Sequence, residues 1–276
     1  MLKRIITGII AVAILVPVLI FSDTVVFPIA LALVGLISMF EIFKCLGLEK
    51  KISVILPAYC ASLVFPFLVR YTNIAASIAT ICALLYLIYI FAHIIWSHGK
   101  FAFNDALTAY TLVIYILLSL SSVIYIRDFE EIGKYIYILI FLGAWVTDIF
   151  AYFTGVFFGK HKLIEDVSPK KTIEGSIGGI VFCALSFVLF GIIIDSFFGT
   201  DSNIIFLIIC GIIISVISQI GDLIMSVVKR HYKIKDFGKL FPGHGGVLDR
   251  FDSILAVAVG IVCVCMFVSL TGIKLI

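Results

Sequence analysis

The chain has 276 residues, of which 63% are hydrophobic and 13% are charged, and its net charge is +3. Soluble globular domains are about 45–50% apolar and about 25% charged, so the composition argues against a soluble fold. The 21 glycines and six prolines follow no period, and the mean hydropathy of +1.25 comes from long apolar blocks. Collagen-like and disordered chains are therefore excluded. The seven cysteines form no CxxC pair, which disfavours a disulfide scaffold or a zinc site.

Nine apolar blocks are long enough to cross a lipid bilayer. A spanning helix needs about 20 apolar residues, because it rises about 1.5 Å per residue through a hydrocarbon core about 30 Å thick. The blocks are Ile5–Phe21, Val25–Phe43, Ile52–Val69, Ile74–Trp96, Leu107–Ile126, Tyr135–Phe158, Ile177–Phe198, Ile204–Met225 and Ile254–Ile273. We predict an all-α polytopic membrane protein with about nine helices and short loops. Because no small-residue cleavage site follows the first block, we interpret it as a retained span rather than a signal peptide.

The basic residues gather on one side of this predicted topology. Sixteen of the 20 Lys and Arg residues fall at the N-terminus or in the loops after spans 2, 4, 6 and 8. Basic loops stay in the cytoplasm, so the N-terminus and these loops are predicted to be cytoplasmic. We expect a single integral membrane domain over residues 1–276, with spans 1–5 in residues 1–130 and the catalytic spans 6–9 in residues 135–276.

Most of the polar sequence lies in two cytoplasmic loops, 159–176 and 226–253, and in the spans that lead into them. Asp148 lies inside span 6, where an unpaired carboxylate costs roughly 2.5–3.5 kcal/mol, so it should face protein, water or a cation. A structural hydrogen bond to a neighbouring helix is the alternative. Span 8 carries a polar stripe at helical spacing that is not expected to face lipid. Its members are Ser215, Gln219, Asp222 and Ser226.

Three carboxylates are predicted near the cytoplasmic boundary of the membrane. Asp249 and Asp252 are three residues apart at the entrance to span 9, so both point the same way if that turn is helical. Together with Asp222 they offer oxygen ligands of the kind that Mg²⁺ prefers. The alternative is that these acids only neutralise Lys229, Arg230 and Arg250. Glu41 and Lys44 are interpreted as an interfacial pair at the end of span 2.

Groups suited to phosphate stand around these acids. The segment 168–175 offers two ammonium groups and two hydroxyl groups, and its candidate binding residues are Ser168, Lys170, Lys171, Thr172 and Glu174. His244 offers an imidazole, and Gly245 and Gly246 let the backbone approach a ligand closely. A basic loop alone often reflects only topology and attraction to anionic lipid. A site with both signs of charge is what a metal–triphosphate complex requires.

These motifs resemble the phosphatidate cytidylyltransferase (CDP-diacylglycerol synthase) family of bacteria. The match covers every fixed position of the family signature over 27 residues, and Gln219–Asp222, Asp148–Tyr152, Gly159–Lys162 and Ser168–Gly175 also read like the family. The signature positions are Ser226-Val-Val-Lys-Arg230, Lys235-Asp236-Phe-Gly238, Phe241-Pro242, His244-Gly-Gly246 and Asp249-Arg250-Phe-Asp252.

The resemblance implies transfer of the cytidylyl group from CTP to phosphatidic acid in the bacterial cytoplasmic membrane, with the active site facing the cytoplasm. It implies that Asp222 and Asp249 hold Mg²⁺, with a second cation left open, and that the protein is a homodimer. We expect no nucleic acid partner. The implied catalytic residues are Asp222, Lys229, Arg230, His244, Asp249 and Asp252. The remaining substrate-binding candidates are Asp148, Ser226, Lys235, Asp236 and Arg250, and the basic residues would bind the phosphates of CTP or the lipid headgroup.

Two other functional classes fit parts of this pattern. A related CTP-dependent transferase acting on an ether lipid would need the same residues, whereas a CDP-alcohol phosphotransferase would need a run of helix-spaced aspartates that the chain lacks. A transporter for an anionic phosphorylated solute would place its charges near mid-membrane and often shows an internal repeat. In this chain most polar residues lie at one face, and a purely structural scaffold would leave the clustered acids and glycines unexplained.

Overall fold

The protein is a bundle of long helices in the computed structural model, which describes residues 2–97, 101–130, 132–241, 243 and 245–276, with the side chains of residues 2–6 excepted. Within that part of the chain, eight helices are long and apolar enough to cross a membrane, and Thr7–Ile20 forms a shorter apolar helix. The prediction of an all-α polytopic membrane protein with about nine helices is confirmed. The helices fall into two compact units, residues 1–125 with 231–250 and residues 126–230 with 251–276.

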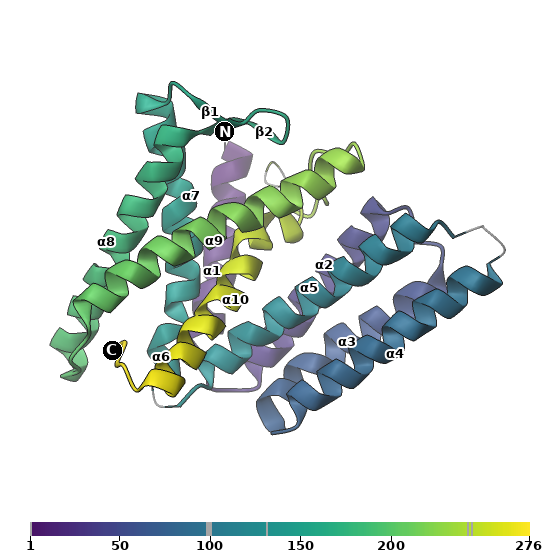
Figure 1. Ribbon diagram of the computed structural model, residues 1–276, viewed down its shortest axis with the longest axis horizontal. Helices are drawn as coiled ribbons and strands as arrows, with labels where there is room; N and C mark the ends of the chain where they lie inside the picture. The colour runs from purple at the N-terminus through teal and green to yellow at the C-terminus, as the bar shows by residue number, and fades with distance from the viewer. Residues whose placement is uncertain (1, 98–100, 131, 242, 244) are drawn as a thin grey trace. The chain divides into compact units, whose positions relative to one another are not determined.

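The first unit contains the N-terminal helices. They are α1 (Leu2–Ile20), α2 (Val26–Cys45), α3 (Ile52–Tyr71), α4 (Ala75–Trp96) and most of α5 (Phe103–Arg127). Helix α3 packs against α2 on one side and α4 on the other, and Figure 1 shows α3 and α4 running side by side. The Arg70 guanidinium, at the end of α3, donates to the carbonyls of Ser22, Asp23 and Thr24 at 2.6–2.9 Å. These charge-assisted bonds fix the connection between α1 and α2.

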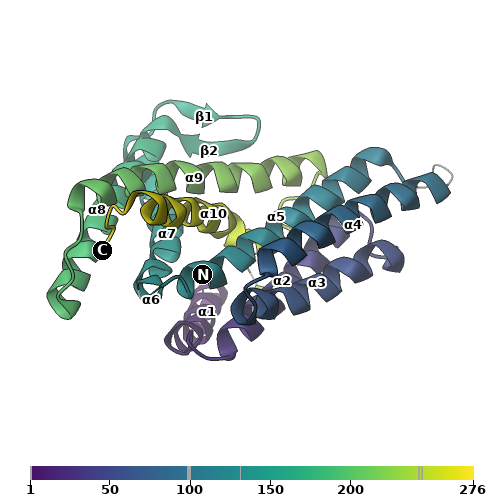
Figure 2. The ribbon, with the colours of Figure 1, turned by 60° about the horizontal axis from the view of Figure 1, so that its bottom comes forward.

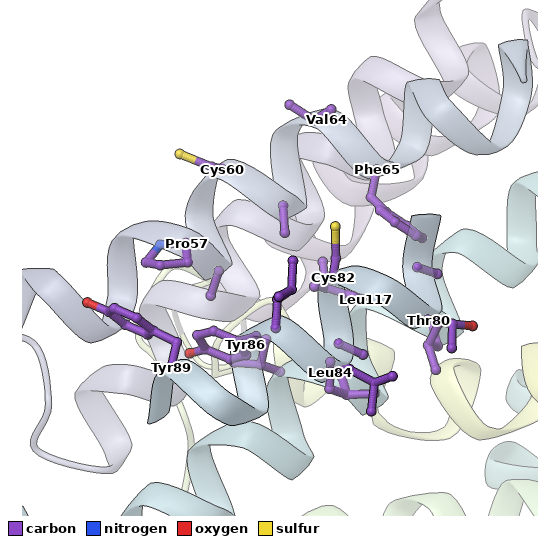
Figure 3. A pocket seen from close by; sticks show the side chains of 18 of the residues that line it. Pro57, Cys60, Val64, Phe65, Thr80, Cys82, Leu84, Tyr86, Tyr89 and Leu117 are labelled. Carbon is purple, nitrogen blue, oxygen red and sulfur yellow. The ribbon is translucent and has the colours of Figure 1, made fainter. Parts of the chain in front are cut away.

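A cavity of about 770 Å³ lies among α3, α4 and α5, and Figure 3 shows its lining. The lining is aliphatic and aromatic, and the Tyr86 and Tyr89 hydroxyls donate to the carbonyls of Val54 and Ser53 in the first turn of α3. No predicted site residue is among the residues that line it. The cavity therefore contributes nothing to the candidate site below.

The second unit contains the helices that carry most of the predicted site. They are α6 (Gly133–Ile136), α7 (Ile138–Phe158), α8 (Ile173–Phe198), α9 (Ile204–His231) and α10 (Leu248–Thr271), although the last residue of α9 and the first three residues of α10 belong to the first unit. A hairpin of β1 (Lys162–Ile164) and antiparallel β2 (Ser168–Thr172) connects α7 to α8. Figure 2 shows this hairpin at one end of the α7–α8 pair. The Thr172 hydroxyl accepts from the Gly175 amide at 3.1 Å and caps α8 directly after the hairpin.

Glycines let the helices of the second unit approach closely. A Cβ on Gly143 of α7 would lie 2.6 Å from Ile214 of α9, and one on Gly211 of α9 would lie 2.6 Å from the Ala184 Cα of α8. A Cβ on Gly221 would lie 2.5 Å from the Ala256 Cβ of α10. Association of helices in a bilayer depends on close packing of this kind, because lipid tails are as apolar as the helix surfaces. The contacts fix the positions of the polar residues on α7, α9 and α10.

Substitution of Gly211 by alanine is expected to destabilise the second unit. The new methyl group would meet the backbone of α8, which cannot yield as a flexible side chain can, and overpacking of this kind costs about 1–3 kcal/mol. The measurement is the melting temperature of the purified protein in detergent. Gly8→Ala is the matched control, because no atom lies within 4 Å of its Cβ position and alanine favours the helix. Equal melting temperatures for the two variants would contradict this account of the packing.

The structure corrects the extent of the two predicted loops. Helix α8 begins at Ile173, α9 continues to His231 and α10 begins at Leu248, so residues 173–176, 226–231 and 248–253 are helical. The apolar blocks locate only the part of each helix that lies in hydrocarbon, whereas helices with polar ends extend beyond it. The single integral membrane domain expected over residues 1–276 stays a prediction.

Candidate active site

An ion pair links the hairpin to α9 in the second unit. Lys171 Nζ, at the end of β2, lies 2.5 Å from Asp222 Oδ2, and both side chains are 24% exposed. Residue 171 directly precedes the α8 cap, so the capping bond at Thr172 also fixes the backbone that carries this ammonium group. The structure thus brings together a predicted phosphate-binding lysine and a predicted metal-binding aspartate, which are 51 positions apart in the sequence.

A second group of opposite charges joins α9 and α10. Lys229 Nζ lies 3.9 Å from Asp252 Oδ2, and their side chains are only 11% and 12% exposed. Asp148 of α7 accepts a hydrogen bond from the Ser253 hydroxyl at 3.2 Å. The carboxylates of Asp222 and Asp148 act on Asp252 by charge repulsion, whereas Lys229 attracts it. Asp148, Asp222 and Asp252 therefore lie near one another in the second unit. The hydrogen bond of Asp148 to α10 is the alternative that the sequence left open, and its role in substrate binding stays a prediction.

Three of the four residues in the polar stripe on α9 are buried within the protein, and Asp222 is partly exposed. Ser215 is fully buried and accepts from the Thr147 hydroxyl of α7 at 2.9 Å, while the Gln219 amide donates to the Ser176 carbonyl of α8 at 3.3 Å. Ser226 is also buried, with a relative exposure of 9%. The prediction that this stripe does not face lipid is confirmed. Its members hold α9 against α7 and α8 and so place Asp222.

The hairpin is tied to α8 by Glu174. Its carboxylate lies 2.7 Å from His161 Nδ1 and accepts from the backbone amides of Lys160 and His161 at 3.1–3.3 Å. Glu174 was predicted to bind substrate, and in the structure it organises the turn between α7 and the hairpin. Lys170 is exposed on β2, Ser168 is half-buried, and the Arg230 guanidinium donates to the Val167 carbonyl at 3.3 Å.

Asp249 organises the loop that connects α9 and α10, residues 232–247, which lies in the first unit and is called the signature loop below. Its Oδ2 accepts from the backbone amides of Phe237 at 2.8 Å and Gly246 at 2.9 Å, and the residue is only 6% exposed. Gly245 adopts a φ of +90°, and a Cβ there would lie 2.8 Å from the same Oδ2 atom. Asp222 and Asp249 belong to different units, and each position is described within its own unit.

Glu41 of α2 is a buried acid whose contacts the sequence did not reveal. It is only 3% exposed, and its two carboxylate oxygens accept from the amides of Val247 at 3.0 Å and Leu248 at 2.8 Å. Its interpretation as part of an interfacial pair is wrong, because the carboxylate caps the start of α10. The only sign of this role in the sequence was the presence of an acid within an apolar block. The sequence did not indicate its partner, which lies 207 residues away.

Three further predicted residues of the signature segment lie at the surface of the first unit. Lys235, Asp236 and Arg250 are exposed, and His244 lies outside the described residues. Tyr232 donates from its hydroxyl to Asp105 Oδ1 of α5 at 3.2 Å. Burial raises the pKa of Tyr232, and the nearby carboxylate of Asp105 raises it further, which keeps the phenol protonated as a donor.

Comparison with known families decides the class of this protein. The model of the cytidylyltransferase family matches residues 2–268, which is nearly the whole chain and includes both units. The chain belongs to the cytidylyltransferase family. The prediction from the signature residues is therefore confirmed, and the match extends through the N-terminal helices, which lie outside the signature.

Curated relatives of this cytidylyltransferase carry a more specific name. A protein of Staphylococcus haemolyticus named phosphatidate cytidylyltransferase is 34% identical over 255 residues, which cover 92% of this chain and 95% of the relative. A protein of Bacillus subtilis with the same name is 34% identical over 266 residues, covering 93% of this chain and 94% of the relative. Another, from Staphylococcus epidermidis, is 38% identical over 168 residues and covers about three fifths of each chain.

Proposed function

We propose that this cytidylyltransferase transfers the cytidylyl group of CTP to phosphatidate. In the reaction, a phosphate oxygen of the lipid forms a bond to the α-phosphorus of CTP, the bond from that phosphorus to the bridging oxygen breaks, and pyrophosphate leaves. The products are CDP-diacylglycerol and pyrophosphate. The observation that carries the proposal is the family match over residues 2–268 together with the name of its full-length relatives.

The charged groups of the second unit suit this chemistry. The attacking phosphate oxygen is already ionised near neutral pH, so the protein needs to neutralise charge and align the reactants rather than supply a strong base. Lys171 and Lys229 each lie beside a carboxylate, and both have limited contact with water. We propose that Lys171 and Lys229 donate to phosphate oxygens, with Lys170, Arg230, Lys235 and Arg250 as further candidates.

The donor atoms of the site fit Mg²⁺. Asp222 and Asp249 each offer carboxylate oxygens, the donor atoms that Mg²⁺ prefers. Among the described residues, no group of three or more His, Cys, Asp or Glu side chains is placed to hold a metal ion. Asp222 and Asp249 stay the predicted ligands, and a second cation stays open. When bound, Mg²⁺ would neutralise phosphate charge and favour departure of pyrophosphate. Lys171 balances the charge of Asp222 through their ion pair.

The proposal also covers the side of the membrane that the active site faces and the oligomeric state of the protein. The helices identify an integral membrane protein, and we propose that its active site faces the cytoplasm, because 16 of the 20 Lys and Arg residues fall on that predicted face. CTP is dissolved in water and phosphatidate is held in the leaflet, so the reaction must occur at their boundary. The homodimer implied by the family resemblance stays a prediction, which cross-linking in native membranes would test.

A transfer assay on detergent-purified protein tests the proposed function. Labelled CTP and phosphatidate are incubated with and without Mg²⁺, and an ether-linked analogue of phosphatidate is offered in parallel. The expected product chromatographs as CDP-diacylglycerol, and its formation requires Mg²⁺. Exclusive use of the ether lipid would replace the proposed acceptor. Absence of product from folded protein with every lipid would reject the transferase function.

A further inference from the structure

We infer that Glu41 of α2 is a positioning residue for Asp249, and this inference rests on the proposed function of Asp249 in cytidylyl transfer. No predicted site residue lies within 20 residues of Glu41 in the sequence. In the structure, however, Glu41 is buried against the signature loop of its own unit. Its carboxylate accepts from two successive backbone amides, those of Val247 and Leu248. The next residue in the chain is Asp249.

The two carboxylates hold adjacent parts of one loop. Asp249 binds the amides of Phe237 and Gly246, whereas Glu41 binds the two amides that follow Gly246. All four amides are therefore oriented by carboxylate oxygens at 2.8–3.0 Å. Charge-assisted hydrogen bonds of this kind are stronger than bonds between neutral groups. The backbone on both sides of the Asp249 carboxylate is thus fixed, and part of that order comes from a distant helix.

Two glycines of the signature make room for the Glu41 carboxylate. A Cβ built on Gly238 or on Gly246 would collide with Glu41 Oε1. The Gly238 Cβ position also lies 3.0 Å from the Gly246 Cα, so the two limbs of the loop pass each other closely at this carboxylate. These contacts explain why both positions require glycine. The two glycines admit the carboxylate that joins the limbs, in addition to any role in approach to a ligand.

A group that acts on phosphate or a cation must be held in a narrow range of positions for catalysis. Asp249 is attached to the loop through its backbone and through its two bonds to loop amides, so movement of the loop moves the carboxylate. Loss of the Glu41 bonds therefore leaves the Asp249 carboxylate present, but its position is expected to become disordered. Glu41 needs no contact with substrate for this effect.

The test compares Glu41→Gln with Glu49→Gln, the same chemical change at an exposed residue after α2. The amide of the new glutamine side chain cannot accept from both backbone amides. Hydrogen exchange in the peptide that contains residues 246–248 is expected to accelerate about 10- to 100-fold in Glu41→Gln, since bonds to charged groups contribute about 1.5–3 kcal/mol. We expect kcat to fall about tenfold, the Mg²⁺ concentration for half-maximal activity to rise, and the KM for CTP to change less than threefold. Glu49→Gln should match the wild type in each measurement.

A second variant approaches the same contact from the loop. Gly246→Ala retains Glu41 but displaces its carboxylate, and the same changes in exchange, kcat and Mg²⁺ dependence are expected. The kcat of the double variant should be no more than about twofold below that of the less active single variant, because both changes remove the same interaction. If Glu41→Gln does not fold, Gly246→Ala alone decides the matter.

Each outcome has a defined meaning. Faster loop exchange with wild-type kcat and wild-type Mg²⁺ dependence would overturn the inference, because it would show a purely structural role. Unchanged exchange in a folded Glu41→Gln protein would overturn it as well. A wild-type protein without transfer activity would reject the proposed function, and the exchange measurement would still show whether Glu41 orders the loop.

Discussion

Replacement of Asp222 by asparagine is expected to lower kcat for cytidylyl transfer by at least about 10²–10³-fold, the range found when one preorganised charged or polar group is removed from an active site. The change preserves shape but removes the negative charge. Asp222 is also the partner of Lys171 at 2.5 Å, so the variant leaves that ammonium group beside a neutral amide. The assay is the transfer reaction with labelled CTP at saturating phosphatidate over a range of Mg²⁺ concentrations.

Asp166→Asn is the control for this experiment. Asp166 is exposed in the hairpin turn of the same unit, so the control makes the same chemical change without removing a site carboxylate. Both variants should retain wild-type melting temperatures within a few degrees, because Asp222 is partly solvated and its ion pair contributes little to folding. A folded Asp222→Asn protein with near wild-type kcat and Mg²⁺ dependence would remove Asp222 from the predicted site.

The sequence was most informative where one physical requirement controls the pattern. The length of the apolar blocks identified the membrane spans. The polar side chains of Gln219 and Asp222 on α9 indicated a face turned toward protein, and Gln219 is indeed buried. Lys171 and Asp222, which were assigned to phosphate and to the cation, form an ion pair in the structure, and those two roles stay predictions. These features depend on local composition and helical spacing, which a single sequence displays.

The features that the sequence did not predict depend on contacts between distant segments. The hairpin at residues 162–172 is short and rich in basic residues, so neither alternation of apolar residues nor length distinguished it from a loop. Glu41 appeared as an isolated acid near a span end, because its role requires the amides of Val247 and Leu248. Gly246 was assigned to ligand approach and Gly238 was only a signature position, whereas the structure shows that both accommodate this carboxylate.

Replacement of Lys171 by methionine is expected to weaken catalysis but to strengthen the binding of Mg²⁺, so that kcat and the Mg²⁺ concentration for half-maximal activity both fall. Methionine has a similar length but no charge, so a phosphate oxygen would lose its predicted donor and kcat should fall about 10²-fold. The Asp222 carboxylate would lose the ammonium group that now lies 2.5 Å away. A cation and that ammonium group compete for the same negative charge, so half-maximal activity should require roughly two- to tenfold less Mg²⁺.

This opposition separates a catalytic lysine from one that only maintains the fold. Lys160→Met, an exposed lysine that precedes the same hairpin, should retain both kcat and the wild-type Mg²⁺ dependence. A lysine needed only for folding would lower the melting temperature and the amount of active protein, but the active fraction would keep its Mg²⁺ requirement. A higher Mg²⁺ requirement in Lys171→Met would contradict the competition argument and would indicate that Lys171 orients Asp222 for the cation. Titration at constant ionic strength distinguishes these results, because general screening by salt then affects every variant equally.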